Sequence, residues 1–303
     1  MKHPLVLVTV ALLCVAGVGL AFSAPIVSDA HRSSLTTTHG NQLATETDFD
    51  SPAPAPPDET AAMIVAQAMQ AVLPNTRIGF EVVDRSNNTV LISQNADQQF
   101  ASMSVVKLLI ALDALCSDNW ATPDGATRQQ LHRMLADSDD DIANDLWTAN
   151  GGSAIVTRMV DVLGLTGTQP PGKPSRWGDT MITPRDIVTV YRYLTDQLPG
   201  PSRDFLLGAL ADTPRIAADG FDQHFGVPNG MPHTTWAVKQ GWGTSGSQAM
   251  MNSTGLVGTD LRYIVVVLAA APANSYTTLP KVVTAGAEAL AGMIDNNAGL
   301  FSG

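Results

Sequence analysis

The chain is poor in lysine and cysteine and has no cluster of basic residues, although it is 303 residues long. Its 17 Lys and Arg are outnumbered by 28 Asp and Glu, which gives a formal net charge of −11. Binding to nucleic acid needs a basic face, and binding to anionic lipid headgroups needs clustered Lys or Arg. The composition therefore argues against both partners, and an acidic surface chiefly favours solubility.

The sequence also offers few residues for disulfide bonds or metal sites. Cys14 and Cys116 are the two cysteines, and Cys14 lies in an N-terminal apolar run that a signal peptidase would remove. Cys116 would then stand alone, so no internal disulfide is expected. The histidines are scattered without the spacing of a metal site, and we expect neither a metal nor another cofactor. A chain of this length can bury a sufficient core without such links.

The N-terminal region carries targeting signals. A basic start precedes the apolar run from Pro4 to Phe22, and small residues follow it. The pattern predicts a signal peptide over residues 1–23, or a single N-terminal membrane anchor because the run is long. Cys14 follows a leucine where a lipobox needs a small residue, so lipidation is not expected. Residues 24–58, rich in Ser, Thr, Ala and Pro, predict a disordered linker. Residues 59–303 would form a domain that is secreted or lies in the cell envelope.

Ser104 and Lys107 form the most informative pair in the chain. Three residues apart at the start of a helix, they share one face, and the apolar residues that follow predict that this helix is buried. A buried ammonium is costly unless it is paired or its pKa falls. A lysine with a lowered pKa can activate a serine without histidine. The alternative is a helix-capping serine followed by a lysine that reaches the surface.

Periodicity predicts strands near both ends of the domain and helices between them. The expected helices are 60–73, one from 104, 127–136, 141–149, 154–163, one from 183, 202–210 and 282–294, and the expected strands are 77–84, 89–93, 236–240, 249–257 and 263–270. This order indicates an α/β (α+β) fold with one antiparallel sheet built from both ends, flanked by helices, plus an all-helical lobe. A cleft between the lobes is a natural site for a ligand.

Two further segments carry polar side chains of the kinds that catalysis uses. Ser138-Asp139-Asp140 lies on a turn between helices, where an acidic helix cap is the alternative interpretation and the favoured one for Asp139. Lys239-Gln240-Gly241-Trp242 lies on a strand, where the glycine lets backbone approach a ligand. A strand-end lysine in water is the alternative there.

In this order the three segments resemble the marks of the class A β-lactamase and penicillin-recognising serine hydrolases, Ser-x-x-Lys, Ser-Asp-Asn and Lys-Thr-Gly. The resemblance covers about residues 60–297 and is greatest for a branch of secreted actinobacterial proteins with Ser-Asp-Asp and Lys-Gln-Gly-Trp. It implies a β-lactamase/transpeptidase-like fold and a monomer that takes a small-molecule or peptide substrate of the cell-wall type.

The resemblance also implies roles. Ser104 would be the acylated nucleophile, Lys107 its base, and Ser138 the relay of the proton to the leaving group. Lys239 would hold a substrate carboxylate, and the backbone N–H groups of Ser104 and Trp242 would form an oxyanion hole, worth ~3 kcal/mol per donor.

The chain departs from the family pattern at three places. Asp140 replaces an asparagine, so it cannot donate to substrate, and its charge should raise the pKa of Lys107. Gln240 replaces a threonine, and we expect its amide to donate to a substrate carboxylate. The loop 164–180 contains no glutamate, which in the family activates the water for deacylation, so β-lactam hydrolysis should be slow or absent. Arg176 and Trp177 of this loop could line the cleft or plug it.

Two interpretations follow. The first is an exported serine hydrolase or acyl transferase that acts on a peptide, ester or β-lactam at the cell envelope. The second is a catalytically degenerate protein that binds wall peptide in the same cleft, which Asp140 and the missing glutamate favour.

Overall fold

The computed structural model describes the backbone of residues 57–300 and the side chains of residues 57–294. The predicted signal segment 1–23 and nearly all of the predicted linker 24–58 lie outside the described residues. The α-helices are α1 (Glu59–Val72), α2 (Lys107–Ser117), α3 (Gly125–Ala136), α4 (Asp140–Ala149), α5 (Ala154–Leu163), α6 (Pro184–Asp196), α7 (Gly200–Ala211), α8 (Val227–Gly230) and α9 (Leu279–Leu300). Short 3-10 turns are η1 (Met103–Val106), η2 (Trp177–Asp179), η3 (Thr259–Leu261) and η4 (Ala273–Ser275).

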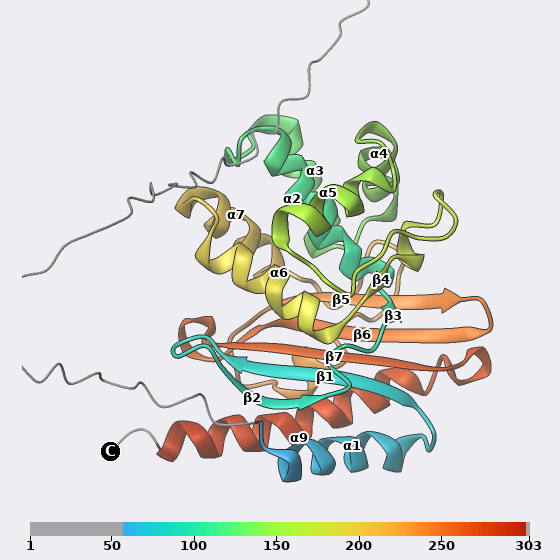
Figure 1. The fold of residues 1–303 in the computed structure, drawn as a ribbon, viewed down its shortest axis with the longest axis vertical. Coiled ribbons are helices and arrows are strands. Elements are labelled where there is room, and N and C mark those ends of the chain that lie inside the picture. Colours follow the sequence, from blue (N-terminus) through green and yellow to red (C-terminus); the bar gives the residue numbers. More distant parts are fainter. Residues whose placement is uncertain (1–56, 301–303) are drawn as a thin grey trace, which may run out of the picture. The chain divides into compact units, whose positions relative to one another are not determined.

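A five-stranded antiparallel sheet forms the centre of the domain (Figure 1). Its strands are β1 (Arg77–Asp84), β2 (Thr89–Gln94), β5 (Trp236–Ser245), β6 (Gln248–Val257) and β7 (Tyr263–Pro272), and their spatial order is β2-β1-β7-β6-β5. The N-terminal strand β1 therefore pairs with the C-terminal strand β7, and β5 is an edge strand. A two-stranded ribbon of β3 (Phe100–Ala101) and β4 (Met181–Ile182) lies apart from this sheet.

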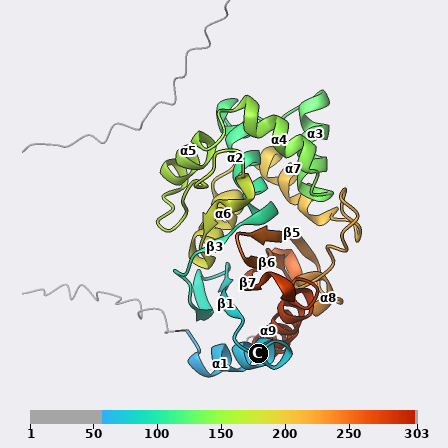
Figure 2. The same cartoon turned by 90° about the vertical axis from the view of Figure 1, so that its right-hand side faces the viewer.

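Helices cover both faces of the sheet. Helices α1 and α9 pack together on one face, while α2 to α7 form a lobe on the other (Figures 1 and 2). Seven of the eight β1 residues are buried, because this interior strand has a core on each side. One core lies between the sheet and the α1/α9 layer, and the larger one joins the sheet to the helical lobe. The lobe meets the sheet at η1, which packs against the edge strand β5.

The predicted architecture is confirmed: an antiparallel sheet built from both ends, covered by terminal helices, with a helical lobe from the middle. Helix α6 starts as expected, with Thr183 as N-cap accepting from the backbone N–H of Asp186 at 3.1 Å and Pro184 in the first turn. The predicted end of the strand at Gln240 is wrong, because β5 continues to Ser245 in full register with β6. Within the described residues, no helix combines the length and apolar character that crossing a bilayer requires.

Candidate active site

Ser104 and Lys107 lie where the chain turns from the β3 ribbon into the helical lobe. Ser104 is in η1 and Lys107 is the first residue of α2, one turn further along. Nearly every residue of α2 is buried, since the helix runs through the centre of the lobe. The Lys107 side chain is fully enclosed, and the Ser104 residue is 5% exposed. The sequence-based prediction of a buried lysine one turn from a serine is confirmed.

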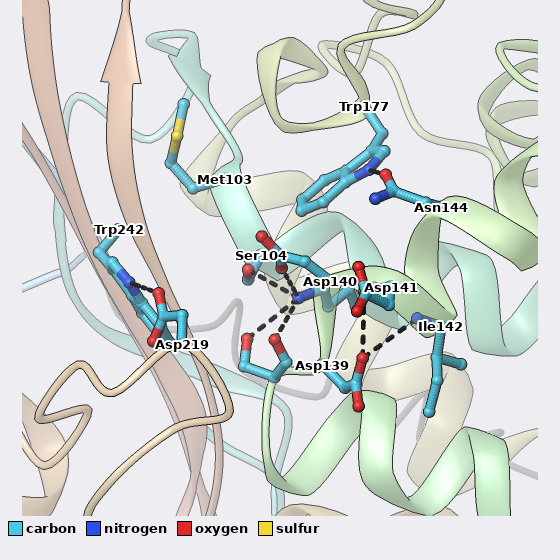
Figure 3. Close-up of polar contacts among 12 residues, drawn as sticks. Met103, Ser104, Asp139, Asp140, Asp141, Ile142, Asn144, Trp177, Asp219 and Trp242 are labelled. Atoms are coloured by element: carbon cyan, nitrogen blue, oxygen red, sulfur yellow. Dashed lines mark hydrogen bonds and ion pairs between the residues drawn. The ribbon is translucent and has the colours of Figure 1, made fainter.

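The ammonium of Lys107 donates to oxygen atoms of three residues from two segments of the chain (Figure 3). Its Nζ lies 3.0 Å from Ser104 Oγ, 2.7 Å from the Ser138 carbonyl oxygen and 3.2 Å from Ser138 Oγ. A further contact of 2.5 Å joins Nζ to Asp140 Oδ1. Lys107 is therefore within hydrogen-bond distance of the hydroxyl it would have to deprotonate.

Ser138 is shared by two lysines. Lys239 Nζ donates to Ser138 Oγ at 3.0 Å, across 101 residues of sequence, and also to the carbonyl oxygen of Gln240 at 3.2 Å. Lys239 is 1% exposed and lies on the edge strand β5. Two ammonium groups and two hydroxyls that are distant in sequence thus meet beneath one cavity.

Burial dominates the electrostatics of both lysines. It lowers the pKa of Lys107, and the charge and hydrogen bond of Asp140 oppose that shift. Burial, followed by repulsion from Lys107, holds the pKa of Lys239 well below its usual value. The expected effect of Asp140 is present, but desolvation outweighs it. An amine with a lowered pKa is available as a base at a lower pH.

Two residues beside the polar cluster have left-handed backbone conformations. Met103, which precedes Ser104, has φ of +48°, and Ser138 has φ of +55°. Such conformations cost about 1–3 kcal/mol for non-glycine residues and concentrate at functional sites. The turn at Ser138 directs its carbonyl and hydroxyl oxygens toward Lys107.

Gly241 brings β5 against the nucleophile. A Cβ at this position would lie 2.6 Å from the Ser102 carbonyl oxygen and 3.2 Å from the Ser104 backbone nitrogen. Opposite Gly241 on β6, Asn252 donates to the carbonyl oxygens of Ala101 (3.0 Å) and Ser102 (3.1 Å). Only a glycine allows this approach to the backbone of Ser102 and Ser104, whereas the predicted approach of this backbone to a ligand stays a prediction.

The aspartates of the segment Ser138-Asp139-Asp140 have different roles, as the sequence indicated. Asp139 is the N-cap of α4, accepts from the backbone N–H groups of Asp141 and Ile142, and pairs with Arg133 at 2.6 Å. Asp140 instead points to Lys107 and lines the cavity, with 57% of its side chain exposed. Only Asp140 and Ser138 of this segment therefore belong to the site.

The structure does not bring the Gln240 amide into the site, contrary to expectation. Gln240 is fully buried, and its Nε2 donates to the carbonyl oxygens of Gln223 (3.2 Å) and Phe225 (2.5 Å). Successive strand residues point to opposite faces, so Gln240 and Lys239 cannot both face the lobe. The amide supports the loop behind β5 and is not free to bind a substrate carboxylate.

The loop between α5 and β4 lines the cavity with Arg176 and Trp177. The Trp177 ring lies over the Lys107 ammonium, 5.0 Å from ring centroid to Nζ, and its indole N–H donates to Asn144 Oδ1 at 2.8 Å. Arg176 pairs with Asp179 and also donates to the Thr244 carbonyl oxygen at 3.1 Å. The loop is thereby fastened to α4 on one side and to the end of β5 on the other.

A cavity of about 370 Å³ opens above Ser104. Trp242 and Asp219 lie on its β5 side, while Trp177 and Asn144 lie on the opposite side (Figure 3). Sequence reasoning missed Asp219 and Tyr276 as lining residues, because both lie in irregular segments without periodicity or motif. Within residues 57–294, no group of three or more metal-ligating side chains gathers at this cavity or elsewhere.

The fold is that of class A β-lactamases and of PBP-A. The PBP-A structure covers 80% of this chain and 99% of its own, with a TM-score of 0.62 and 20% sequence identity. A β-lactamase from Chitinophaga pinensis covers 78% of this chain and 99% of its own, with a TM-score of 0.61 and 15% identity. Likeness at these identities establishes the fold alone.

Sequence similarity identifies the family to which the chain belongs. The protein named "Putative lipoprotein LppW" in Mycobacterium tuberculosis is 33% identical over 234 residues, which span 75% of this chain and 70% of that protein. Its Mycobacterium bovis counterpart matches equally. No protein-family model matches the chain. The chain belongs to the LppW family.

Proposed function

We propose that the protein is an exported serine hydrolase or acyl transferase whose nucleophile is Ser104. The observation that carries the proposal is the 3.0 Å contact between Ser104 Oγ and the buried Nζ of Lys107, a lysine whose pKa burial lowers. A buried amine beside a hydroxyl is the arrangement that activates serine without histidine. The sharing of Ser138 Oγ between Lys107 and Lys239 supports a proton path away from the nucleophile.

Each group takes one role in the acylation step. Neutral Lys107 accepts the Ser104 proton while Oγ attacks the substrate carbonyl. The oxyanion that forms is held by the backbone N–H groups of Ser104 and Trp242, next to the close approach at Gly241. Ser138 passes a proton to the departing atom, and Lys239 stabilises the Ser138 hydroxyl as it does so. The product is an ester on Ser104.

Deacylation is the slow step in this proposal. Residues 164–180 contain no glutamate, and Trp177 and Arg176 of this segment line the cavity. The acyl-enzyme should therefore persist, with slow or absent β-lactam hydrolysis. A PBP-A variant forms an acyl-enzyme complex with penicillin G, which supports acylation within this fold.

We place the protein outside the cytoplasm, as a monomer at the cell envelope. Residues 1–23 would direct export, residues 24–58 would space the domain from its attachment, and residues 59–303 would carry the site. The lipoprotein name of the LppW relatives supports an envelope location. A substrate of the cell-wall type, a small molecule or a peptide, suits that location.

Intact-mass measurement tests the proposed function. Purified protein is exposed to a fluorophosphonate and, separately, to a fluorescent penicillin. We expect a single adduct that is absent in Ser104→Ala and strongly reduced in Lys107→Met. Ser102→Ala is the matched control, because Ser102 lies two residues away and does not contact Lys107. Failure of both probes to label folded wild-type protein contradicts the proposal.

A non-catalytic peptide binder is the second candidate, and the Lys107–Asp140 ion pair favours it. A carboxylate at 2.5 Å stabilises the charged lysine, which cannot act as a base. This candidate predicts saturable binding of soluble wall fragments that survives Ser104→Ala, together with no adduct from either probe.

A further inference from the structure

The cavity above Ser104 carries one carboxylate without a counter-ion. Three carboxylates line it, and two of them contact a basic side chain: Asp140 contacts Lys107, and Asp179 contacts Arg176. Asp219 forms no ion pair with any described residue within 4.0 Å. A negative charge therefore faces the cavity opposite Trp177.

The Asp219 carboxylate is held in place beside aromatic rings. Oδ2 accepts from the Trp242 indole N–H at 3.0 Å, and Oδ1 accepts from the Phe221 backbone N–H at 2.9 Å. The Phe221 and Trp242 rings stack, with centroids 5.0 Å apart and planes at 13°. The ring centroid of Tyr276 lies 6.0 Å from that of Phe221, and Tyr276 also lines the cavity. A fixed carboxylate next to aromatic faces is the chemistry that binds ammonium groups.

The same side of the cavity offers little to an anion. The Gln240 amide is committed to two backbone carbonyls, and Arg176 is committed to Asp179 and the Thr244 carbonyl. Lys239 is buried and donates to Ser138 Oγ and the Gln240 carbonyl. An anionic group near Asp219 would meet repulsion before it reached a free donor.

The position of Asp219 indicates which part of a substrate it contacts. Strand β5 links Asp219 to Ser138: Trp242 of this strand donates to Asp219, and Lys239 of the same strand donates to Ser138 Oγ. In the proposed reaction Ser138 protonates the leaving group, so the leaving group lies on this side of Ser104. Asp219 and Tyr276 then border the leaving group, and Trp177 borders the acyl part.

We propose that the cavity selects acyl donors whose leaving group carries an ammonium cation, with Asp219 as the specificity-determining residue and Trp242 and Tyr276 as its aromatic walls. This proposal rests on the proposed function of Ser104. The reaction transfers the acyl group from a thioester, amide or ester to Ser104 Oγ: the oxygen–carbon bond forms, the bond to the leaving atom breaks, and the serine proton leaves with that atom.

Three phenylacetyl thioesters test the selectivity. They differ only in the leaving thiol, which is thiocholine (cationic), its neutral tert-butyl isostere, or mercaptopropionate (anionic). The rate of the acyl mass shift on the protein is measured for wild type, Asp219→Asn and Asp222→Asn. Asp222 is the matched control, because it lies on the same segment, pairs with Arg215 and does not line this cavity.

We expect wild type and Asp222→Asn to prefer the cationic thioester over the neutral one by about five- to tenfold, as for an exposed charge pair with aromatic support. The anionic thioester should be slowest, and added salt should narrow the differences. Asp219→Asn keeps the hydrogen bond to Trp242 but should lose the preference. Equal rates for the three thioesters in wild type, or an unchanged preference in Asp219→Asn, would overturn the proposal.

A binding measurement separates this inference from the proposed function. Choline and its neutral carbon isostere are titrated into Ser104→Ala while the indole N–H resonance of Trp242 is followed by NMR. A shift with choline alone, lost in Ser104→Ala/Asp219→Asn, supports the cation site even if no thioester acylates Ser104. Absence of any choline-dependent shift refutes the cation site even if acylation proceeds.

Discussion

Replacing Asp140 by asparagine should make Ser104 more reactive near neutral pH. The carboxylate lies 2.5 Å from Lys107 Nζ and stabilises the ammonium form. An opposite charge at such a distance favours the charged form of the amine, and water screens this effect because 57% of the Asp140 side chain is exposed. A screened ion pair is worth about 0.2–1 kcal/mol, which corresponds to a change of up to about fivefold in the fraction of neutral amine below the pKa.

The sign follows from which form of the lysine is catalytic. Loss of the carboxylate destabilises the charged amine, so the pKa of Lys107 falls further and more free base is present at any pH below it. The acidic limb of the labelling rate against pH should move to lower pH, with a rise of up to about fivefold on that limb and an unchanged plateau.

The assay is the rate constant for fluorophosphonate labelling, measured by intact mass between about pH 5 and 9. Asp141→Asn is the control, since Asp141 follows directly in α4 but has no contact with Lys107. A limb that stays in place or moves to higher pH in folded Asp140→Asn would refute the argument that Asp140 restrains the base.

Two further predictions concern stability. Burial makes the pKa of Lys239 lower in the folded chain than in the unfolded chain. At a pH between these two pKa values, the unfolded chain therefore carries a proton on Lys239 that the folded chain lacks. In that pH range the unfolding free energy rises with pH, by at most about 1.4 kcal/mol per pH unit. Urea unfolding at neutral and at alkaline pH should show this rise reduced in Lys239→Met; equal slopes would contradict it. Gly241→Ala should lose about 1–3 kcal/mol and slow labelling, because its Cβ would meet the Ser102 carbonyl, whereas Gly172→Ala, which has open space, should be neutral by thermal unfolding. A fully stable, fully active Gly241→Ala would show that β5 can move away.

Much of the fold could be predicted because local signals agreed with the global arrangement. The Thr183-Pro184 start of α6 and the alternation of β1 specify their elements from neighbouring residues alone. The pairing of β1 with β7 could be expected because strands at both ends of the domain need partners. The end of β5 was misplaced because Gly241 resembles a strand terminator, while its actual role is a close contact with residues far away in sequence.

The site was predictable where a motif specified it and not elsewhere. Ser104, Lys107, Ser138 and Lys239 come together as expected, because each lies on a regular element or directly beside one. Asp219 could not be found, since it lies in an irregular segment whose position depends on the stacking of Phe221 on Trp242. The burial of Gln240 follows from strand alternation, but its carbonyl partners do not.

The pairing of β1 with β7 also sets an order of folding. The two strands adjoin in the sheet, yet nearly the whole domain separates them in sequence, and Arg77 pairs with Ala270. During synthesis β1 has no partner on that side until almost the entire chain has emerged, and contacts of such long range form slowly. The sheet therefore cannot close until β7 is available, so the early-made strands of the domain wait for a partner that is made near the end of the described residues.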